Sequence, residues 1–236
     1  MVDFLTTARA AKPKNTKRSR RIASPWILGL YALAGATFIL GTRMAGWYSA
    51  PDSQFFLFPF SAALGGIALL AGMWAFEASE GLATVMLTIW GSFWVAYALL
   101  MALFLSGKLS EPAERFPQLG IWFIVLAAIT WVGAGAALVE SSALALTLGF
   151  LAGGSTLAAI AKLAGFAGPA MVAGWLFIIS ALIGWYTATA MLLDAMVGHS
   201  VLPLGDNADT TQPMRSERAG EPGSVPGPTP ASRRIG

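Results

Sequence analysis

Long apolar runs separated by short polar breaks dominate this chain. Six runs can be marked, at roughly 26–47, 55–76, 82–105, 118–138, 142–162 and 169–193. Each run is close to the roughly 20 apolar residues that a helix needs to cross the hydrocarbon core of a bilayer. Polar and apolar positions do not alternate within the runs, as they do in the strands of a membrane barrel. Because a backbone in lipid must satisfy its own hydrogen bonds, the pattern predicts six transmembrane helices in an all-α polytopic bundle.

Composition supports this interpretation and excludes several classes of protein. Of the 236 residues, 56% are apolar and 11% are charged, whereas a soluble domain is about 25% charged. Three stretches carry no charge at all, and they span residues 116–139, 141–161 and 163–193. The chain has no cysteine and one histidine, His199. A soluble enzyme, a disulfide scaffold, a thiolate metal site and a two-histidine metal site are therefore not expected.

The two ends of the chain differ from the region between them. Residues 1–24 form a basic arm that holds seven of the fifteen basic residues. Such an arm is more typical of a cytoplasmic segment beside anionic lipid than of a nucleic-acid-binding segment, because it lacks interleaved aromatic residues. Residues 206–236 are rich in proline and glycine, and we expect them to be disordered. The arm and tail together carry eleven of the fifteen basic residues, which predicts that both termini flank the domain 25–205 on the cytoplasmic side.

Catalytic and metal-binding motifs are absent from the sequence. It contains no Walker-type phosphate loop and no His-Glu-x-x-His motif. The polar groups within the apolar runs are mostly hydroxyls, and Thr88 and Ser92 lie close to the mid-run indoles of Trp90 and Trp94. Hydroxyls in such helices usually bond their own backbone, and mid-run indoles usually pack in the core. The alternative is that these four groups line a pathway.

Three stretches together resemble the acetate uptake transporter family. The start, SPWILGL at residues 24–30, is similar to the family's N-P-x-P-L-G-L motif. The middle, AGMWAF at 71–76 followed by WGSFW at 90–94, is similar to A-G-M-W-E-F and Y-G-x-F-W. The end, GHSVLPLG at 198–205, is similar to G-R-T-V-L-P-[LI]-G and follows a helix bearing Tyr186. Two glutamates of the family's motifs are replaced here, by Ala75 and by Met191.

The resemblance implies a six-helix protomer that assembles into a homohexamer, with a pathway for acetate or a similar small carboxylate in each protomer. The family's hydrophobic constriction corresponds here to Leu33, Trp90 and Leu146. The loss of polar groups relative to the family leaves two other functions open. One is a membrane interaction or scaffold protein that does not transport, and the other is a channel for small neutral solutes.

The sequence therefore predicts a multi-pass protein of the bacterial inner membrane that transports or conducts a small monocarboxylate. No enzymatic activity, cofactor, metal or nucleic acid is expected, and the partners are the substrate, the lipid bilayer and further copies of the chain. Polar groups expected along the path are those of Thr88, Ser92, Trp94 and Tyr186. Arg43 and Lys162, at the predicted outer ends of two helices, are expected to attract the anion.

Overall fold

The structure is a computed structural model, and it describes residues 24–48, 53–110 and 115–205. Within these ranges the regular structure is entirely helical: α1 (Pro25–Met44), α2 (Ser53–Glu77), α3 (Gly81–Leu105), α4 (Pro117–Glu140), α5 (Ser142–Ala164) and α6 (Ala167–Val197). All six helices are long and apolar enough to cross a membrane. This confirms the predicted six-helix membrane bundle. The expectations for the basic arm and the proline-rich tail lie outside the described residues.

The helix ends follow local sequence signals. Pro25 and Pro117 open α1 and α4, where the missing proline N–H has no helical partner to lose. The Ser141 side chain accepts a hydrogen bond from the backbone N–H of Leu144 and so caps α5. Gly165 and Gly198 end α5 and α6 with φ of 77° and 83°, a left-handed conformation that favours glycine.

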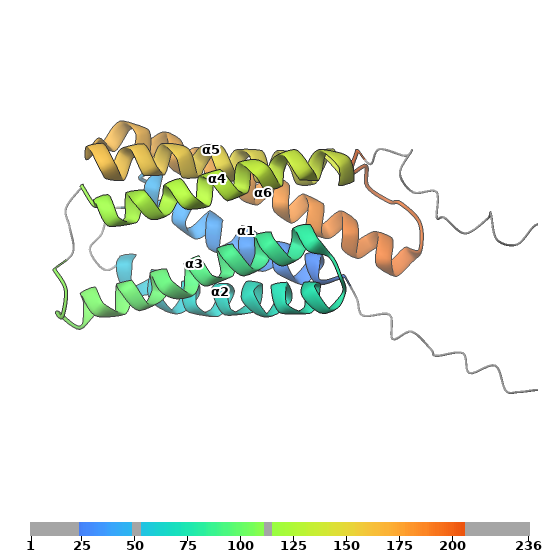
Figure 1. Cartoon of the computed structure of the whole chain (residues 1–236), viewed down its shortest axis with the longest axis horizontal. Helices are drawn as coiled ribbons and strands as arrows, with labels where there is room; N and C mark the ends of the chain where they lie inside the picture. Colours follow the sequence, from blue (N-terminus) through green and yellow to red (C-terminus); the bar gives the residue numbers. More distant parts are fainter. Residues whose placement is uncertain (1–23, 49–52, 111–114, 206–236) are drawn as a thin grey trace, which may run out of the picture.

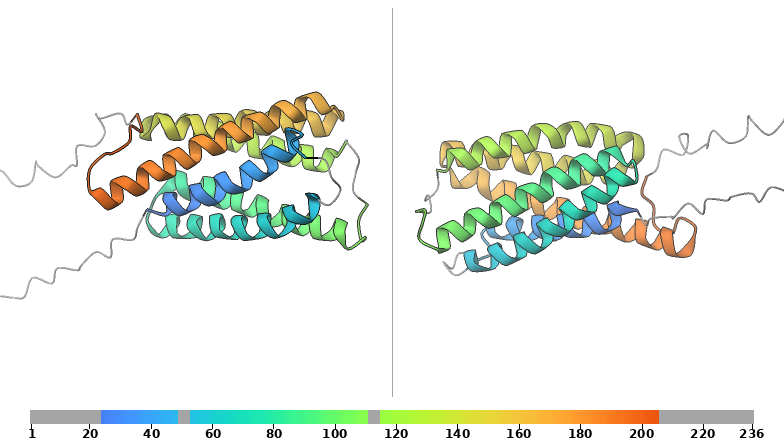
Figure 2. Two further views of the ribbon diagram at one scale, coloured as in Figure 1. Left: turned by 180° about the vertical axis from the view of Figure 1, so that it is seen from behind. Right: turned by 60° about the horizontal axis from the view of Figure 1, so that its bottom comes forward.

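Three antiparallel helix pairs make up the bundle (Figures 1 and 2). Helix α2 pairs with α3, α4 pairs with α5, and α1 pairs with α6 although the last two are far apart in sequence. Contacts between α5 and α6 and between α1 and α2 join these pairs, whereas α3 and α4 make few contacts with each other. The helices thus form a ring whose thinnest seam lies between α3 and α4.

Glycines allow the closest helix contacts. A methyl group added at Gly91 would lie 2.5 Å from the backbone nitrogen of Leu69, so α3 and α2 touch backbone to backbone there. A methyl group at Gly174 would lie 2.3 Å from the backbone nitrogen of Ala45, which places α6 equally close to the end of α1. Such approaches supply packing between helices in lipid, where the hydrophobic effect does not drive them together.

The segment after α6, residues 198–205, returns to the start of α5. The backbone N–H of Ala143 donates to the carbonyl of Leu204 at 3.1 Å, and the hydroxyl of Ser141 donates to the same carbonyl at 2.9 Å. The hydroxyl of Tyr186 donates to the carbonyl of Pro203 at 2.8 Å. The bond from Ala143 satisfies an N–H group of the first turn of α5 that has no partner within the helix. The closing motif therefore anchors the chain to α5.

Candidate functional site

A polar cavity opens inside the ring at the end remote from Pro25 and Val197. Its volume is about 220 Å³. Five helices and the residue just before α4 contribute its lining, which consists of Leu40, Arg43, Met44, Tyr97, Met101, Phe104, Phe116, Leu119, Phe123, Lys162 and Ala170. These residues come from the C-terminal parts of α1, α3 and α5 and from the N-terminal parts of α4 and α6. We call this cavity the vestibule.

Two cationic side chains face the vestibule. Arg43 lies in the last turn of α1 and Lys162 in the last turn of α5, and both line the cavity. The sequence places both at outer helix ends, but 118 residues separate them, so no local pattern indicates that they line one cavity. Both charged side chains among the described lining residues are cationic. A concave site with cationic groups and low-dielectric walls focuses the field and concentrates anions. The vestibule is therefore suited to collecting small anions.

An aromatic cluster fills the interior next to the vestibule. Trp90, Phe93, Trp94 and Tyr97 recur at helical spacing along one face of α3, and none is more than 7% exposed. Phe93 is the centre of the cluster, with ring centroids 5.6 Å from Trp90, 5.0 Å from Trp94 and 5.7 Å from Tyr97. Phe123 of α4 joins it at 5.5 Å from Phe93. The inward face of α3 thus forms an aromatic barrier below the vestibule.

Trp90 and Leu33 both lie within the buried core. Leu33 is 2% exposed and Trp90 is 1% exposed, and they belong to one cluster of buried hydrophobic residues. The Trp90 indole N–H donates to the hydroxyl of Thr130 at 3.0 Å, and that hydroxyl donates to the carbonyl of Leu126. The indole of Trp90 is thus held in place by α4 and presents an apolar ring to the interior.

Leu146 does not join Leu33 and Trp90 in the protomer. Its side chain is 54% exposed and lies on the outer face of α5, beside a surface groove. The prediction of Leu146 at a constriction rests on the family resemblance. A shift of two residues turns a helix by about 200°, and Leu148, two residues further on, is fully buried in the same cluster as Leu33 and Trp90.

Three further predicted polar residues lie away from the vestibule and the aromatic cluster. Ser92 is exposed on the outside of α3. Thr88 donates to the carbonyl of Thr84 in its own helix, and its methyl group packs close to Gly72 of α2. Tyr186 is 39% exposed and anchors Pro203 as described above. The structure places Thr88 and Tyr186 in packing and anchoring contacts, and it does not bring these three residues to the vestibule or the aromatic cluster.

Trp94 differs from Trp90 in the hydrogen bonding of its indole N–H. Its Nε1 is buried, and within the described part of the chain it has no hydrogen-bond partner. The hydroxyl of Thr37 in α1 is likewise buried and has no hydrogen-bond partner among the described residues. Nothing in the local sequence around Thr37 separates it from hydroxyls that bond their own helix, so the sequence does not single it out.

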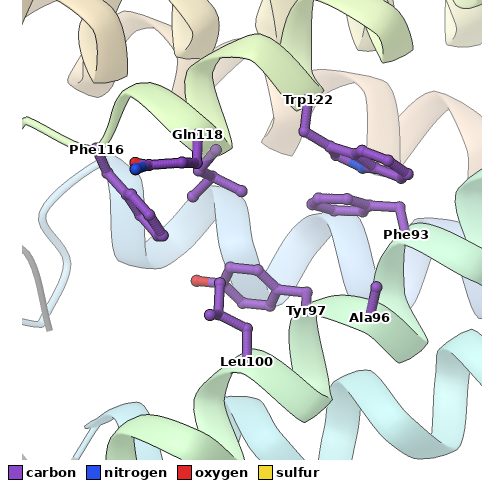
Figure 3. Close-up of a pocket in the computed structure, with 8 residues that line it drawn as sticks. Phe93, Ala96, Tyr97, Leu100, Phe116, Gln118 and Trp122 are labelled. Atoms are coloured by element: carbon purple, nitrogen blue, oxygen red, sulfur yellow. The ribbon is translucent and has the colours of Figure 1, made fainter. Parts of the chain in front are cut away.

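A second, apolar cavity of about 230 Å³ lies at the α3–α4 seam. Tyr97, Phe116 and Leu119 line both this cavity and the vestibule. In Figure 3, Phe93 and Tyr97 reach into this cavity from α3, and Trp122 reaches into it from α4. The described residues include no group of three metal-ligating side chains.

Comparison with known proteins gives one consistent relationship. The sequence matches the GPR1/FUN34/yaaH family over residues 7–204. It is 26% identical over 192 residues to the succinate-acetate/proton symporter SatP of Escherichia coli K12, covering 79% of this chain and 97% of the relative. The SatP protein of Shigella flexneri matches to the same extent.

A solved structure shares the fold. It is the bacterial acetate channel SatP, with a TM-score of 0.69 and 26% sequence identity, and the match covers 78% of this chain and all of the solved chain. These relatives are transporters or channels and not enzymes, and they agree with the predicted multi-pass protein of the inner membrane. The family match covers most of the chain and includes all six helices, so this protein belongs to the GPR1/FUN34/yaaH family, as its resemblance to acetate uptake transporters predicted.

Proposed function

We propose that this protein is a transporter or channel for acetate or a similar small monocarboxylate, through a pathway within each protomer. The observation that carries the proposal is the vestibule, where Arg43 and Lys162 line one cavity inside the ring of helices. The relatives are named for succinate, acetate and a proton, and the solved structure for acetate. A two-cation vestibule fits this substrate class.

The vestibule and the aromatic cluster have different roles in this proposal. Arg43 and Lys162 raise the local concentration of carboxylate at the mouth. Leu33, Trp90 and Leu148, which replaces Leu146, form the hydrophobic constriction below it. A hydrophobic constriction selects against hydrated ions, because an ion must lose water to pass. Selectivity then depends on how the carboxyl group is accommodated between the two regions.

We also propose that the protein is a homo-oligomer, and the family resemblance implies a hexamer. Part of the outer surface of α2 supports this assembly. Ala62 is exposed, and a methyl group at Gly66 would meet nothing within 4 Å in the protomer. Small residues spaced by four allow a helix of another subunit to approach closely in lipid.

Uptake of labelled acetate by cells that lack their own acetate permeases tests the transport proposal. The intact protein should raise uptake above background. Arg43→Gln and Lys162→Gln should each raise the half-saturating acetate concentration severalfold and leave the maximal rate little changed, because they weaken collection of the anion. The effect should shrink at high ionic strength.

Lys108→Gln is the matched control. Lys108 lies just after α3 at the same end of the bundle, but its side chain is exposed and does not line the vestibule. Its removal should leave the half-saturating concentration unchanged. Acetate uptake at background level in cells that carry the intact protein in their membrane would overturn the proposed function.

A further inference from the structure

Two polar side chains in the core have no hydrogen-bond partner among the described residues, namely the indole N–H of Trp94 and the hydroxyl of Thr37. Trp94 is 1% exposed and Thr37 is 2% exposed. A buried polar group without a partner destabilises a fold by about 1–3 kcal/mol, and most buried polar groups in proteins are paired. Two such groups in one core therefore require an explanation.

Both residues lie between the vestibule and the proposed constriction. On α1, Thr37 follows Leu33 by four residues and precedes the vestibule residues Leu40 and Met44 by three and seven. Residues at these spacings share one face of a helix. On α3, Trp94 stands in the same relation to Trp90 before it and to Tyr97 and Met101 after it.

Thr37 and Trp94 also lie at the same depth along the bundle. Helices α1 and α3 run in the same direction and touch where Gly29 faces Leu87, since a methyl group at Gly29 would lie 2.2 Å from the Leu87 side chain. At about 1.5 Å per residue, Thr37 lies about 12 Å beyond this contact and Trp94 about 10.5 Å beyond it. The two unpaired groups are thus level with each other, one helical turn below the floor of the vestibule.

The chemistry of the pair matches an uncharged carboxylic acid. An indole N–H only donates a hydrogen bond, whereas a threonine hydroxyl both donates and accepts. The carbonyl of an acid can accept from Trp94, and its O–H can donate to Thr37. A carboxylate has no such proton, and no charged side chain is buried among the residues that the structure describes. An unpaired anion at this depth carries a large desolvation cost.

We propose that Thr37 and Trp94 form a binding station that takes the neutral carboxylic acid group between the vestibule and the constriction. The inference rests on the proposed transport of small monocarboxylates. A carboxylate that moves from the vestibule into the station takes up one proton from water on that side, and the acid releases it to water on the other side. The substrate itself thus carries the proton, without a titrating side chain in the core.

Acetamide tests this station, because it is an uncharged isostere of acetic acid with the same carbonyl acceptor and an N–H donor in place of the acid O–H. The full chain is reconstituted in liposomes, and acetamide flux is followed by stopped-flow light scattering beside labelled acetate flux. Acetamide should permeate through the protein and compete with acetate. Thr37→Val and Trp94→Phe should each lower both fluxes by about five- to tenfold, the effect of losing one hydrogen bond.

Matched variants separate the station from general packing. Thr187→Val removes another fully buried hydroxyl, which donates to the carbonyl of Ile183 in its own helix, and should leave both fluxes unchanged. Thr37→Ser keeps the hydroxyl and should retain most of the flux even if Thr37→Val folds poorly. Arg43→Gln should lower acetate flux at low concentration and leave acetamide flux unchanged, because acetamide has no charge.

The outcomes distinguish the station from the function on which it rests. Acetate flux without any acetamide flux or competition would overturn the station and leave the transport proposal standing. A folded Thr37→Val protein with wild-type fluxes of both acetate and acetamide would also overturn the station and leave the transport proposal standing. Absence of acetate flux from the intact protein would instead overturn the transport proposal.

Discussion

Trp90 and Trp94 show how the surroundings of single residues decide their roles. The two indoles lie one turn apart on the same face of α3 and are equally buried. Thr130 of α4 accepts the N–H of Trp90, whereas no described residue accepts that of Trp94. One tryptophan therefore ties two helices together, and the other is the donor of the proposed station. The sequence motif that contains both does not distinguish them.

Glu80, in the link between α2 and α3, gives a prediction at the same scale. Burial raises the pKa of this carboxyl group, and a side-chain hydrogen bond from Ser24 partly offsets the effect. One of its carboxyl oxygens is buried without a partner in the described part of the chain. A raised pKa means that the folded state prefers the protonated form. The stabilisation is therefore complete below the ordinary value of 4.5 and is lost as the pH rises through the raised pKa.

Glu80→Gln should consequently raise the midpoint of thermal unfolding at pH 7, because the amide removes the charge that burial disfavours. The advantage over the wild type should diminish as the pH falls toward 4.5. Unfolding of the detergent-solubilised protein across this range measures it. Glu77→Gln, at an exposed position, should show no such trend. A Glu80→Gln advantage that stays constant with pH would contradict the prediction.

At the scale of the helices, the rotation of each helix about its axis decides which residues face the interior and which face outward. Helix α5 turns Leu148 inward and Leu146 outward, so the position of a residue along the chain alone did not show which leucine of α5 faces the interior. Pairs of small residues spaced by four also differ in whether they face inward or outward. Gly133 packs against Met86 and Ala137 is buried, whereas Ala62 and Gly66 face outward from α2. The first pair serves packing within the protomer, and the second is available to another subunit.

The contact between α2 and α3 can be tested with a single methyl group. Gly91→Ala should destabilise the protein by about 1–3 kcal/mol, the usual effect of overpacking, because the added carbon meets the backbone of Leu69. Gly135→Ala adds the same group where nothing lies within 4 Å and should be neutral or slightly stabilising, since alanine favours the helix. Thermal unfolding of both variants measures the difference. Equal unfolding midpoints for the two variants would contradict the close contact.

The ring of helices gives the whole molecule two unlike ends. One end holds the vestibule with Arg43 and Lys162, and the other holds the segment 198–205 bound to the start of α5. Eleven of the fifteen basic residues precede α1 or follow that segment, which predicts that the anchored end is cytoplasmic. The vestibule would then face the outside of the cell.

The natural absence of cysteine allows this orientation to be tested directly. Ser106→Cys lies at the vestibule end and Ser200→Cys at the anchored end, and both positions are exposed. A thiol reagent that cannot cross membranes should label Ser106→Cys on intact cells and Ser200→Cys only after lysis. The opposite labelling pattern would show that the protein has the reverse orientation.

The sequence by itself determined the number of helices, their approximate bounds and the family. Hydrophobic length is a local property of the chain, and a backbone in lipid has no alternative to helix for runs of this length. The family motifs likewise lie within continuous segments, such as WGSFW and GHSVLPLG. The resemblance predicted that Trp90 and Leu33 lie together at a constriction, and the structure places both in the buried core.

Only the tertiary structure decided which side chains meet. Arg43 and Lys162 share a cavity because α1 and α5 end at the same side of the ring. The outward rotation of Leu146 and the anchoring of Pro203 by Tyr186 depend on contacts between distant segments. The unpaired Thr37 and Trp94 could not be recognised from sequence, because a missing hydrogen-bond partner is a property of the packed interior. Helix formation is set by neighbours in sequence, but a pathway is set by neighbours in space.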